Sequence, residues 1–485
     1  MKLSRLLTWV IFLSIFAMAV QVTIDTDTWW HLRAGEWMVE NRSLMEKDLF
    51  SYTREGTPWK YPGLWVEVVM YLIYQWFGPG GLNVWTTSLI TLTFYFVWKT
   101  ISNRGFLGAF VLIIAAAASG IYWSARPYLL SFLFAAVFIW FFEGYQHLAR
   151  NNLWVAPVLM VLWVNSHGAF LIGFLIWGCY FIDSLLRWFV KSRNKEEIDK
   201  VEYQSKHLLV VGVLMGIVLF VNPQGIDLLS LPFTTVSRGA EQLYIEEWQS
   251  PNFHDTRMQP FAALLILTYS AMALSKHRAT IAEILLVSGF GLMGLFSARF
   301  ISIFAVVAPV VLVRHAEEVL SYWSEKLDIE VNIQLDYPPT PIQSWINRLL
   351  VLLLAVIVVY KASMVISWDS NFNVFREALP VDAVEYIKNE RPEGQMFNSY
   401  NFGGYLIWAL PEYQVFIDGR ADLHGDEIIF EWWNIVRGGD GWRESLNKWD
   451  VGFVLVEPGI PLLEKLKDDN WELIYTDEVA VIYQR

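Results

Sequence analysis

Long apolar runs alternate with short polar segments over the first three quarters of the chain. A helix needs about 20 mostly apolar residues to cross a bilayer, and several runs come close to that length. Twelve runs fit, at residues 6–20, 63–77, 82–100, 106–122, 127–143, 153–165, 168–190, 208–222, 260–274, 280–296, 299–313 and 346–366. The pattern predicts a polytopic α-helical membrane protein with about 11 to 12 helices. A cleaved signal peptide is the alternative for the first run.

The positive charges of the loops orient these helices. Most of them fall at 99–104, 147–150, 191–206, 276–278 and 314–348, which share one side if the runs alternate. By the positive-inside rule that side is the cytoplasm, which also receives the N-terminus after Lys2 and Arg5. A C-terminus on the other side requires an odd number of crossings. The short run at 63–77, which contains Glu67, is therefore expected not to cross and to form an interfacial or re-entrant helix.

The pattern changes after Ile366, where short helical and extended stretches alternate. Helices are expected at 382–389, 404–410, 427–436 and 462–467, and strands at 395–400, 414–417, 451–456, 472–476 and 479–483. We therefore expect two domains: a transmembrane domain at 1–366, whose first external loop spans 23–62, and a small extracytoplasmic α/β domain at 367–485.

Composition supports a membrane protein. Hydrophobic residues make up 55% of the chain, and the 25 tryptophans suit lipid–water interfaces. The single cysteine, Cys179, excludes a disulfide framework and a thiolate metal site. The net charge of −12 belongs to the tail, which holds 22 acidic and 10 basic residues from Trp368 onward. Without a basic patch, nucleic acid is not an expected partner.

The first external loop carries the densest candidate chemistry. Asp25 and Asp27 directly follow the first apolar run, and carboxylates near hydrocarbon are costly unless they are used. The pair could hold a divalent cation, Mg²⁺ or Mn²⁺, or one acid could act as a general base on an acceptor hydroxyl. His31 would share a helical face with Asp27 and is a third candidate, as metal ligand, proton carrier or hydrogen-bonding group.

Other residues of this loop are expected to line or complete the site. Trp30 and Arg33 flank His31, and Lys60 stands between two prolines where the loop ends, so that its charge could meet a phosphate. Glu67 could add a further acid near the site. Interfacial anchoring and snorkelling are the alternatives for these side chains.

Two arginines lie at external helix ends, on the same side as the paired acids. Arg126 precedes Pro127 at the start of one run, and Arg299 follows Ser297-Ala298 at the start of another. A guanidinium can hold a phosphate through two hydrogen bonds, so both are candidate ligands of a donor phosphate. Headgroup anchoring is the alternative for each.

Two further external segments are candidates for lining the site. Asn165 and His167 sit between two runs, followed by a glycine that permits close approach, and Glu247 and Trp248 combine acid and aromatic in a lip suited to a sugar. In the tail, Asp418 and Arg420 are expected to form a structural pair, with substrate contact as the alternative. No Walker A, dinucleotide, HExxH or nucleophile-elbow motif occurs in the sequence.

These features together resemble the GT-C superfamily of polytopic glycosyltransferases, which use polyprenyl-phosphate sugars. The branch near bacterial protein O-mannosyltransferases and the lipid A aminoarabinose transferases is the most similar. The resemblance implies that Asp25 and Asp27 act as metal ligand or base, and that Lys60, Arg126 and Arg299 contact the donor phosphate. The Trp-Trp-His-Leu-Arg continuation after these acids departs from the family pattern.

The expected function is transfer of a sugar from a polyprenyl-phosphate donor to a lipid, glycan or protein acceptor. The reaction would take place on the extracytoplasmic face of the cytoplasmic membrane, among membrane lipids. Two other functions remain open, a transporter or flippase for a lipid-linked saccharide and a non-catalytic envelope scaffold. A transporter would place charges deep within the spans, whereas here they gather at one face.

Overall fold

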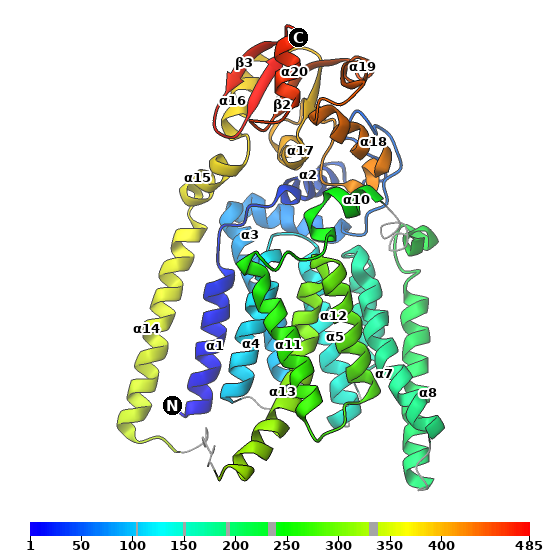
Figure 1. Ribbon diagram of the computed structural model, residues 1–485, viewed down its shortest axis with the longest axis vertical. Helices are drawn as coiled ribbons and strands as arrows, with labels where there is room; N and C mark the ends of the chain where they lie inside the picture. The colour runs from blue at the N-terminus through cyan, green and yellow to red at the C-terminus, as the bar shows by residue number, and fades with distance from the viewer. Residues whose placement is uncertain (103–104, 149–151, 191–194, 231–238, 329–337) are drawn as a thin grey trace.

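The structure is a computed structural model that describes residues 1–102, 105–148, 152–190, 195–230, 239–328 and 338–485. Arg104, Arg150, residues 191–194 and residues 329–337, which contribute to the loops expected in the cytoplasm, lie outside the described residues. The molecule is a long helical bundle with a mixed helix and strand region at one end (Figure 1). The N-terminus lies at the opposite end, as an odd number of crossings requires.

The bundle is built from helices that match the apolar runs of the sequence. They are α1 Leu3–Ala19, α3 Leu64–Thr100, α4 Phe106–Ser119, α5 Tyr128–Leu148, α6 Val155–Val164, α7 Leu171–Val190, α8 Lys195–Val218, α11 Gln259–Leu274, α12 Ile281–Phe296, α13 Ile301–Lys326 and α14 Pro341–Ile366. Capping boxes at Thr280 with Glu283 and at Thr340 with Gln343 start α12 and α14. Short 3-10 turns precede or follow several of them: η1 Gly120–Tyr122, η2 Gly168–Phe170, η3 Gly225–Ser230, η4 Glu246–Trp248, η5 Thr256–Met258 and η6 Ala298–Phe300.

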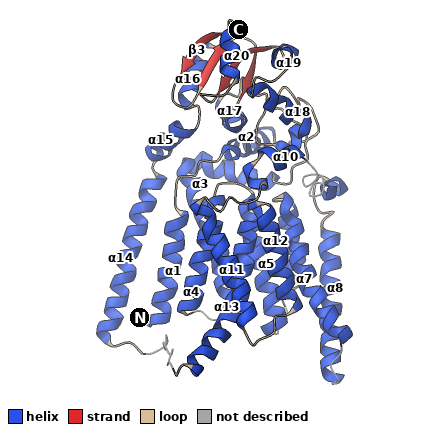
Figure 2. Cartoon of the chain, viewed as in Figure 1, coloured by secondary structure: helices blue, strands red, loops and turns tan. Residues whose placement is uncertain are grey.

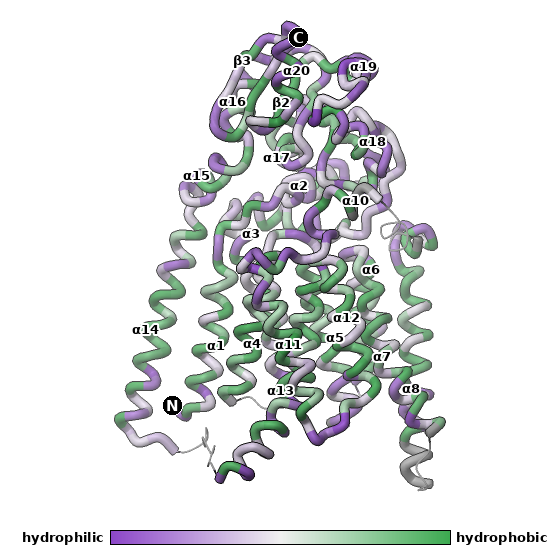
Figure 3. The backbone as a smooth tube through the Cα atoms, viewed as in Figure 1, coloured by the Kyte–Doolittle hydropathy of each residue, from purple (hydrophilic) through white to green (hydrophobic). Residues whose placement is uncertain are grey.

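Five of the described helical stretches are long and apolar enough to cross a membrane: Tyr128–His147, Gly168–Phe189, Val201–Val218, Ala298–Lys326 and Pro341–Ile366. Shorter apolar helices lie at Leu3–Ala19, Phe106–Tyr122, Val155–Val164 and Ile281–Phe296. Hydrophobic residues dominate the middle of the bundle, and hydrophilic residues gather at its two ends (Figure 3). The protein therefore has the architecture expected of a polytopic membrane protein.

Two elements between the first and second spans lie at one end of the bundle. The expected external loop contains a helix, α2 Thr26–Asn41, which Asp25 caps by accepting a hydrogen bond from the Asp27 amide at 2.8 Å. The first part of α3 packs on α2. Gly78 then interrupts α3 with a φ of 61°, a backbone conformation that favours glycine. This break separates residues 64–77 from the following span, as predicted for the run at 63–77.

The C-terminal region holds a four-stranded sheet in the order β1-β2-β4-β3 (Figure 2). β1 Gln395–Asn398 runs parallel to β2 Val451–Val456, and β4 Val481–Gln484 is antiparallel to both β2 and β3 Glu472–Thr476. The helices of this end of the molecule are α10 Gly239–Tyr244, α15 Trp368–Ala378, α16 Val381–Glu390, α17 Tyr400–Ala409, α18 Ala421–Val436, α19 Trp442–Lys448 and α20 Leu462–Asp468. The predicted α/β alternation is confirmed, while α15 and α19 were not foreseen.

One predicted strand is wrong. Residues 414–417 do not form a strand of the sheet, because Val415 pairs with the first external loop instead. Its amide donates to Phe50 O at 2.9 Å, and its carbonyl accepts from the Tyr52 amide at 3.2 Å.

The first external loop and the C-terminal region share one hydrophobic core. It joins Trp30, Ala34, Met38, Met45, Phe50 and Trp59 of the loop to Ala383, Val384, Ile387, Met396, Phe402, Leu406 and Phe453 of the tail, among others. Because both parts contribute side chains to this core, we call the two together the surface layer, residues 23–62 and 367–485. The predicted division at 366/367 stays a prediction, and the layer that covers the bundle draws on both sides of it.

Candidate active site

The paired acids of the first external loop converge on one arginine from the bundle. Arg126 Nε lies 2.5 Å from Asp25 Oδ2, and Arg126 Nη1 lies 3.3 Å from Asp27 Oδ2. Glu247 of η4 joins them, with Oε1 2.9 Å from Arg126 Nη1. We call these four residues the Arg126 cluster. Burial lowers the pKa of the guanidinium, but the three carboxylates more than offset this, so its pKa is raised and it stays charged.

The cluster borders a cavity of about 800 Å³ between the bundle and the surface layer. This volume falls within the range of small-molecule sites. Of the residues of the transmembrane domain and its loops that were selected from the sequence, those that line the cavity are Asp27, Trp30, His31, Arg126, His167, Glu247, Trp248 and Arg299. The structure thus brings together these side chains from five distant parts of the chain.

Asp27 is the acid of this cavity that is best prepared to exchange a proton. Burial raises its pKa to about 7; Arg126 opposes this, and Asp25 and Glu247 add to it. A carboxylate with a pKa near neutrality can take up and release a proton at physiological pH. Gly419 of the tail packs against the Asp27 carboxylate, since a Cβ at this position would lie 1.7 Å from Asp27 Oδ1.

His31 is held from behind by Glu67. Its Nδ1 lies 2.8 Å from Glu67 Oε1, and both side chains are buried. Burial lowers the pKa of His31 and raises that of Glu67, and both shifts favour the neutral forms. A hydrogen bond joins His31 Nδ1 and Glu67 Oε1 and fixes the orientation of the His31 ring. Glu67 itself does not line the cavity and orients His31 instead.

His167 and Arg299 supply donors on the bundle side of the cavity. His167 Nδ1 accepts from the Ala169 amide at 3.2 Å and lies 3.0 Å from Ser131 Oγ, so Nε2 carries its ring hydrogen. Burial, aided by the two cavity arginines, lowers its pKa to about 3, which keeps the ring neutral.

Arg299 differs from Arg126 in its surroundings. Its guanidinium carbon lies 5.0 Å from the ring centre of Trp248 and 5.8 Å from that of Tyr128. Within the described part of the chain, no carboxylate forms an ion pair with it, so its charge is available to an anionic ligand.

The remaining candidates lie outside the cavity lining. Asp25 lines an adjoining pocket of about 220 Å³ together with Arg126. Lys60 is exposed and pairs with Asp227, and Asn165 donates to the carbonyls of Val161 and Val221, each at 2.8 Å. The roles assigned to Lys60 and Asn165 stay predictions.

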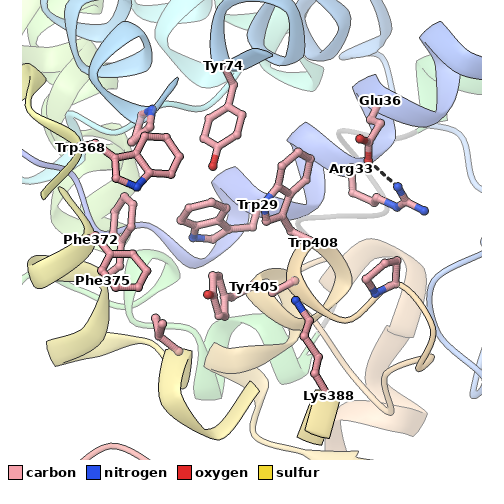
Figure 4. A pocket seen from close by; sticks show the side chains of 14 residues that line it. Trp29, Arg33, Glu36, Tyr74, Trp368, Phe372, Phe375, Lys388, Tyr405 and Trp408 are labelled. Carbon is pink, nitrogen blue, oxygen red and sulfur yellow. Dashed lines mark hydrogen bonds and ion pairs between the residues drawn. The ribbon is translucent and has the colours of Figure 1, made fainter. Parts of the chain in front are cut away.

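Arg33 faces a different pocket, of about 440 Å³, on another side of α2 (Figure 4). There it pairs with Glu36, and the pocket is lined mainly by aromatic side chains: Trp29, Tyr74, Trp368, Phe372, Phe375, Tyr405 and Trp408. The neighbours Trp29 and Trp30 thus serve two different pockets.

The donor set of the Arg126 cluster does not fit a divalent cation as it stands. Three carboxylates would suit Mg²⁺ or Mn²⁺, but the Arg126 guanidinium already lies among their oxygens. Across the described ranges, no group of three or more His, Cys, Asp or Glu side chains is arranged to hold a metal ion.

The tail contributes more to the cavity than the sequence indicated. Tyr400, Asn401, Gly419, Arg420, Ala421 and Asp422 all line it. The predicted structural pair is confirmed, with Arg420 Nη2 2.7 Å from Asp418 Oδ2. Arg420 also reaches Asp48 of the first loop at 2.7 Å, and His424 lies 3.0 Å from Asp418. These fully buried pairs bring the tail onto the cavity; the Asp-Gly-Arg turn was the sequence signal for this contact.

No protein-family model and no curated protein matches the sequence. Among solved structures, the oligosaccharyltransferase of Archaeoglobus fulgidus tethered to an acceptor peptide matches with a TM-score of 0.57 at 14% identity, over 93% of this chain and 69% of that one. The same enzyme, AglB, in complex with an inhibitory peptide and a dolichol-phosphate gives a TM-score of 0.57 at 13% identity, over the same shares.

A third structure, ArnT from Cupriavidus metallidurans bound to undecaprenyl phosphate, matches with a TM-score of 0.52 at 12% identity, over 98% of this chain and 96% of that one. Both enzymes are GT-C glycosyltransferases, and the likeness confirms the predicted fold.

Proposed function

We propose that this chain is a membrane glycosyltransferase that moves a sugar from a polyprenyl-phosphate donor to an acceptor hydroxyl. The observation that carries the proposal is the cavity at the end of the bundle, where Asp27, with a pKa raised to about 7, faces the same space as Arg299, which has no ion-paired carboxylate among the residues that the structure describes. This combination supplies what such a transfer needs, a base for the acceptor and a cation for the phosphate. The shared fold with two such transferases supports it.

The reaction can be written with these residues in place. Asp27 takes the proton of the acceptor hydroxyl, whose oxygen attacks the anomeric carbon of the sugar. The bond from that carbon to the phosphate oxygen breaks, and polyprenyl phosphate leaves with the bonding electrons. Attack opposite the leaving group inverts the anomeric centre. Arg299 stabilises the departing phosphate, the Nε2 hydrogen of His167 donates to a substrate oxygen, and His31 lines the same cavity as a further hydrogen-bonding group.

The partners and location are proposed on the same basis. The structures with the same fold contain dolichol-phosphate, undecaprenyl phosphate or an acceptor peptide, which supports a polyprenyl-phosphate donor here and admits a peptide among lipid, glycan or protein acceptors. We place the protein in the cytoplasmic membrane, with the N-terminus in the cytoplasm and the surface layer outside. The loop positive charge at the end opposite the cavity supports this orientation.

Mass spectrometry of surface glycolipids and glycoproteins tests the proposal. Cells without the native gene would express the wild type, Asp27→Asn or Glu283→Gln at matched membrane levels, Glu283 being a buried acid outside the cavity. The expected result is loss of one sugar increment in Asp27→Asn alone. An unchanged glycan profile in folded Asp27→Asn would contradict the catalytic role and leave the flippase or scaffold.

A further inference from the structure

The Arg126 cluster has an unusual composition for a candidate catalytic site. One guanidinium is shared by three carboxylates that come from the start of α2 and from η4. Two hydrogen bonds hold the backbone of Arg126 at the start of α5. Its amide donates to Ser124 O at 2.8 Å, and its carbonyl accepts from the Leu129 amide at 3.1 Å. The bundle therefore presents one built-in positive charge to acids supplied by the external segments.

The Arg126 guanidinium lies between the carboxylates, at the place that a metal ion would occupy if these three acids formed a metal site. Carboxylate oxygens are the preferred ligands of Mg²⁺ and Mn²⁺, and three such groups without a cation between them would repel one another. Here Nη1 of Arg126 is 3.3 Å from Asp27 and 2.9 Å from Glu247, so the guanidinium occupies the space between the two carboxylates.

We propose that Arg126 is the resident cation of this site, whose guanidinium holds Asp25, Asp27 and Glu247 in place so that the acceptor-facing Asp27 is positioned without a divalent metal ion. Arg126 is in this sense a positioning residue, since it acts through Asp27. The inference deepens the proposed function and rests on it only for the identity of Asp27 as the base.

The second arginine of the cavity provides an internal contrast. Arg299 has aromatic rings beside it and, among the described residues, no ion-paired carboxylate. Its removal would leave no group of acids without a cation. Arg299→Ala is therefore a matched control: it removes the same charge from the same cavity, but from an arginine that no described carboxylate pairs with.

The test uses the full-length protein in detergent and two small cations as probes. Thermal unfolding would be recorded for the wild type, Arg126→Ala and Arg299→Ala with Mn²⁺, with guanidinium at millimolar concentration, or with urea as a neutral molecule of similar shape. We expect Mn²⁺ and guanidinium, but not urea, to raise the unfolding temperature of Arg126→Ala by several degrees and to leave the other two proteins unchanged. Electron paramagnetic resonance should show about one bound Mn²⁺ in Arg126→Ala only.

Two results would overturn the inference. One is stoichiometric Mn²⁺ binding by the wild type that disappears in Asp27→Asn, because the native cluster would then hold a metal. The other is folded Arg126→Ala that responds to neither cation. The wild-type titration decides the matter even where Arg126→Ala cannot be purified. Neither readout depends on sugar transfer, so the proposed function stands or falls on its own glycan experiment.

Discussion

Two arginines, one toward each end of the bundle, are each ion-paired with carboxylates, and the two groups of charges have different roles. Arg126, just before α5, pairs with three acids and borders the cavity. Arg314 of α13 pairs with Glu143 near the other end of α5 and with Glu283 of α12, and neither it nor these acids line that cavity. At a rise of 1.5 Å per residue, Glu143 lies about 22 Å along α5 from its first residue, Tyr128.

The difference lies in what surrounds each charge group. Glu283 also closes the capping box of α12, and Glu143 accepts from Tyr180 of α7 at 2.8 Å, so the acids around Arg314 bind helices to one another. The acids around Arg126 face open volume and include one whose pKa is raised to about 7. A buried ion pair thus indicates a functional site only when a cavity and a shifted pKa accompany it.

The largest effect is expected from replacing the acid that faces the cavity. Asp27→Asn cannot accept a proton and should reduce the rate of sugar transfer per folded molecule by about 10²- to 10⁴-fold. Glu283→Gln at the other end should instead lower the free energy of unfolding by about 1–3 kcal/mol and leave the rate per folded molecule unchanged. Transfer assays on purified protein, combined with thermal unfolding, separate the two. Equal loss of transfer in both variants would abolish the distinction between the two arginine clusters.

A second test concerns Arg420, the buried arginine that joins the surface layer. Arg420→Met leaves Asp48 and Asp418 buried without their cation, and breaking such a pair typically costs about 3–5 kcal/mol. We expect the unfolding temperature to fall and limited proteolysis to release the C-terminal region. The control, Arg443→Met, breaks an exposed pair with Asp469 and should change stability by less than about 1 kcal/mol. If both variants resist protease equally, Arg420 does not hold the layer together.

Gly419 tests whether the tail positions the catalytic acid. A methyl group at this position would overlap Asp27 Oδ1, so Gly419→Ala should displace the carboxylate and reduce transfer by roughly 10- to 100-fold. The matched control is Gly289→Ala in α12, where the added methyl group meets nothing within 4 Å. Steady-state rates of the two variants give the comparison. Full activity of Gly419→Ala would show that the tail does not constrain Asp27.

Much of this architecture could be read from the sequence, because apolar runs report helices directly. All twelve runs correspond to helical segments, including the break at Gly78 that separates the run at 63–77 from the next span. The short helices and strands of the tail could also be predicted from their periodicity, except at residues 414–417. There Val415 forms its backbone hydrogen bond with Phe50, more than 360 residues earlier in the chain, and local periodicity carries no information about such a distant partner.

The site was predictable in its residues more than in its connections. Asp27, Arg126 and Arg299 were selected because charges at helix ends near a membrane need a reason, and the cavity gathers all three. The periodicity of the sequence does not, however, predict which charged side chains form ion pairs with one another. These contacts depend on how distant segments pack together. Arg126 pairs with Glu247, Lys60 pairs with Asp227, and Glu67 forms a hydrogen bond with His31.

The smallest predicted effect is a shift in pH dependence. Because Asp27 must be deprotonated to act as a base, kcat/KM should rise with pH and level off above about 7. The Asp25 carboxylate contributes to raising the pKa of Asp27, so Asp25→Asn should lower that pKa and move the rising limb to lower pH. Asp469→Asn, which removes the same charge from the far surface, should leave the limb in place. A limb that stays fixed in Asp25→Asn would mean that a group other than Asp27 titrates, and it would contradict the assignment of Asp27 as the base.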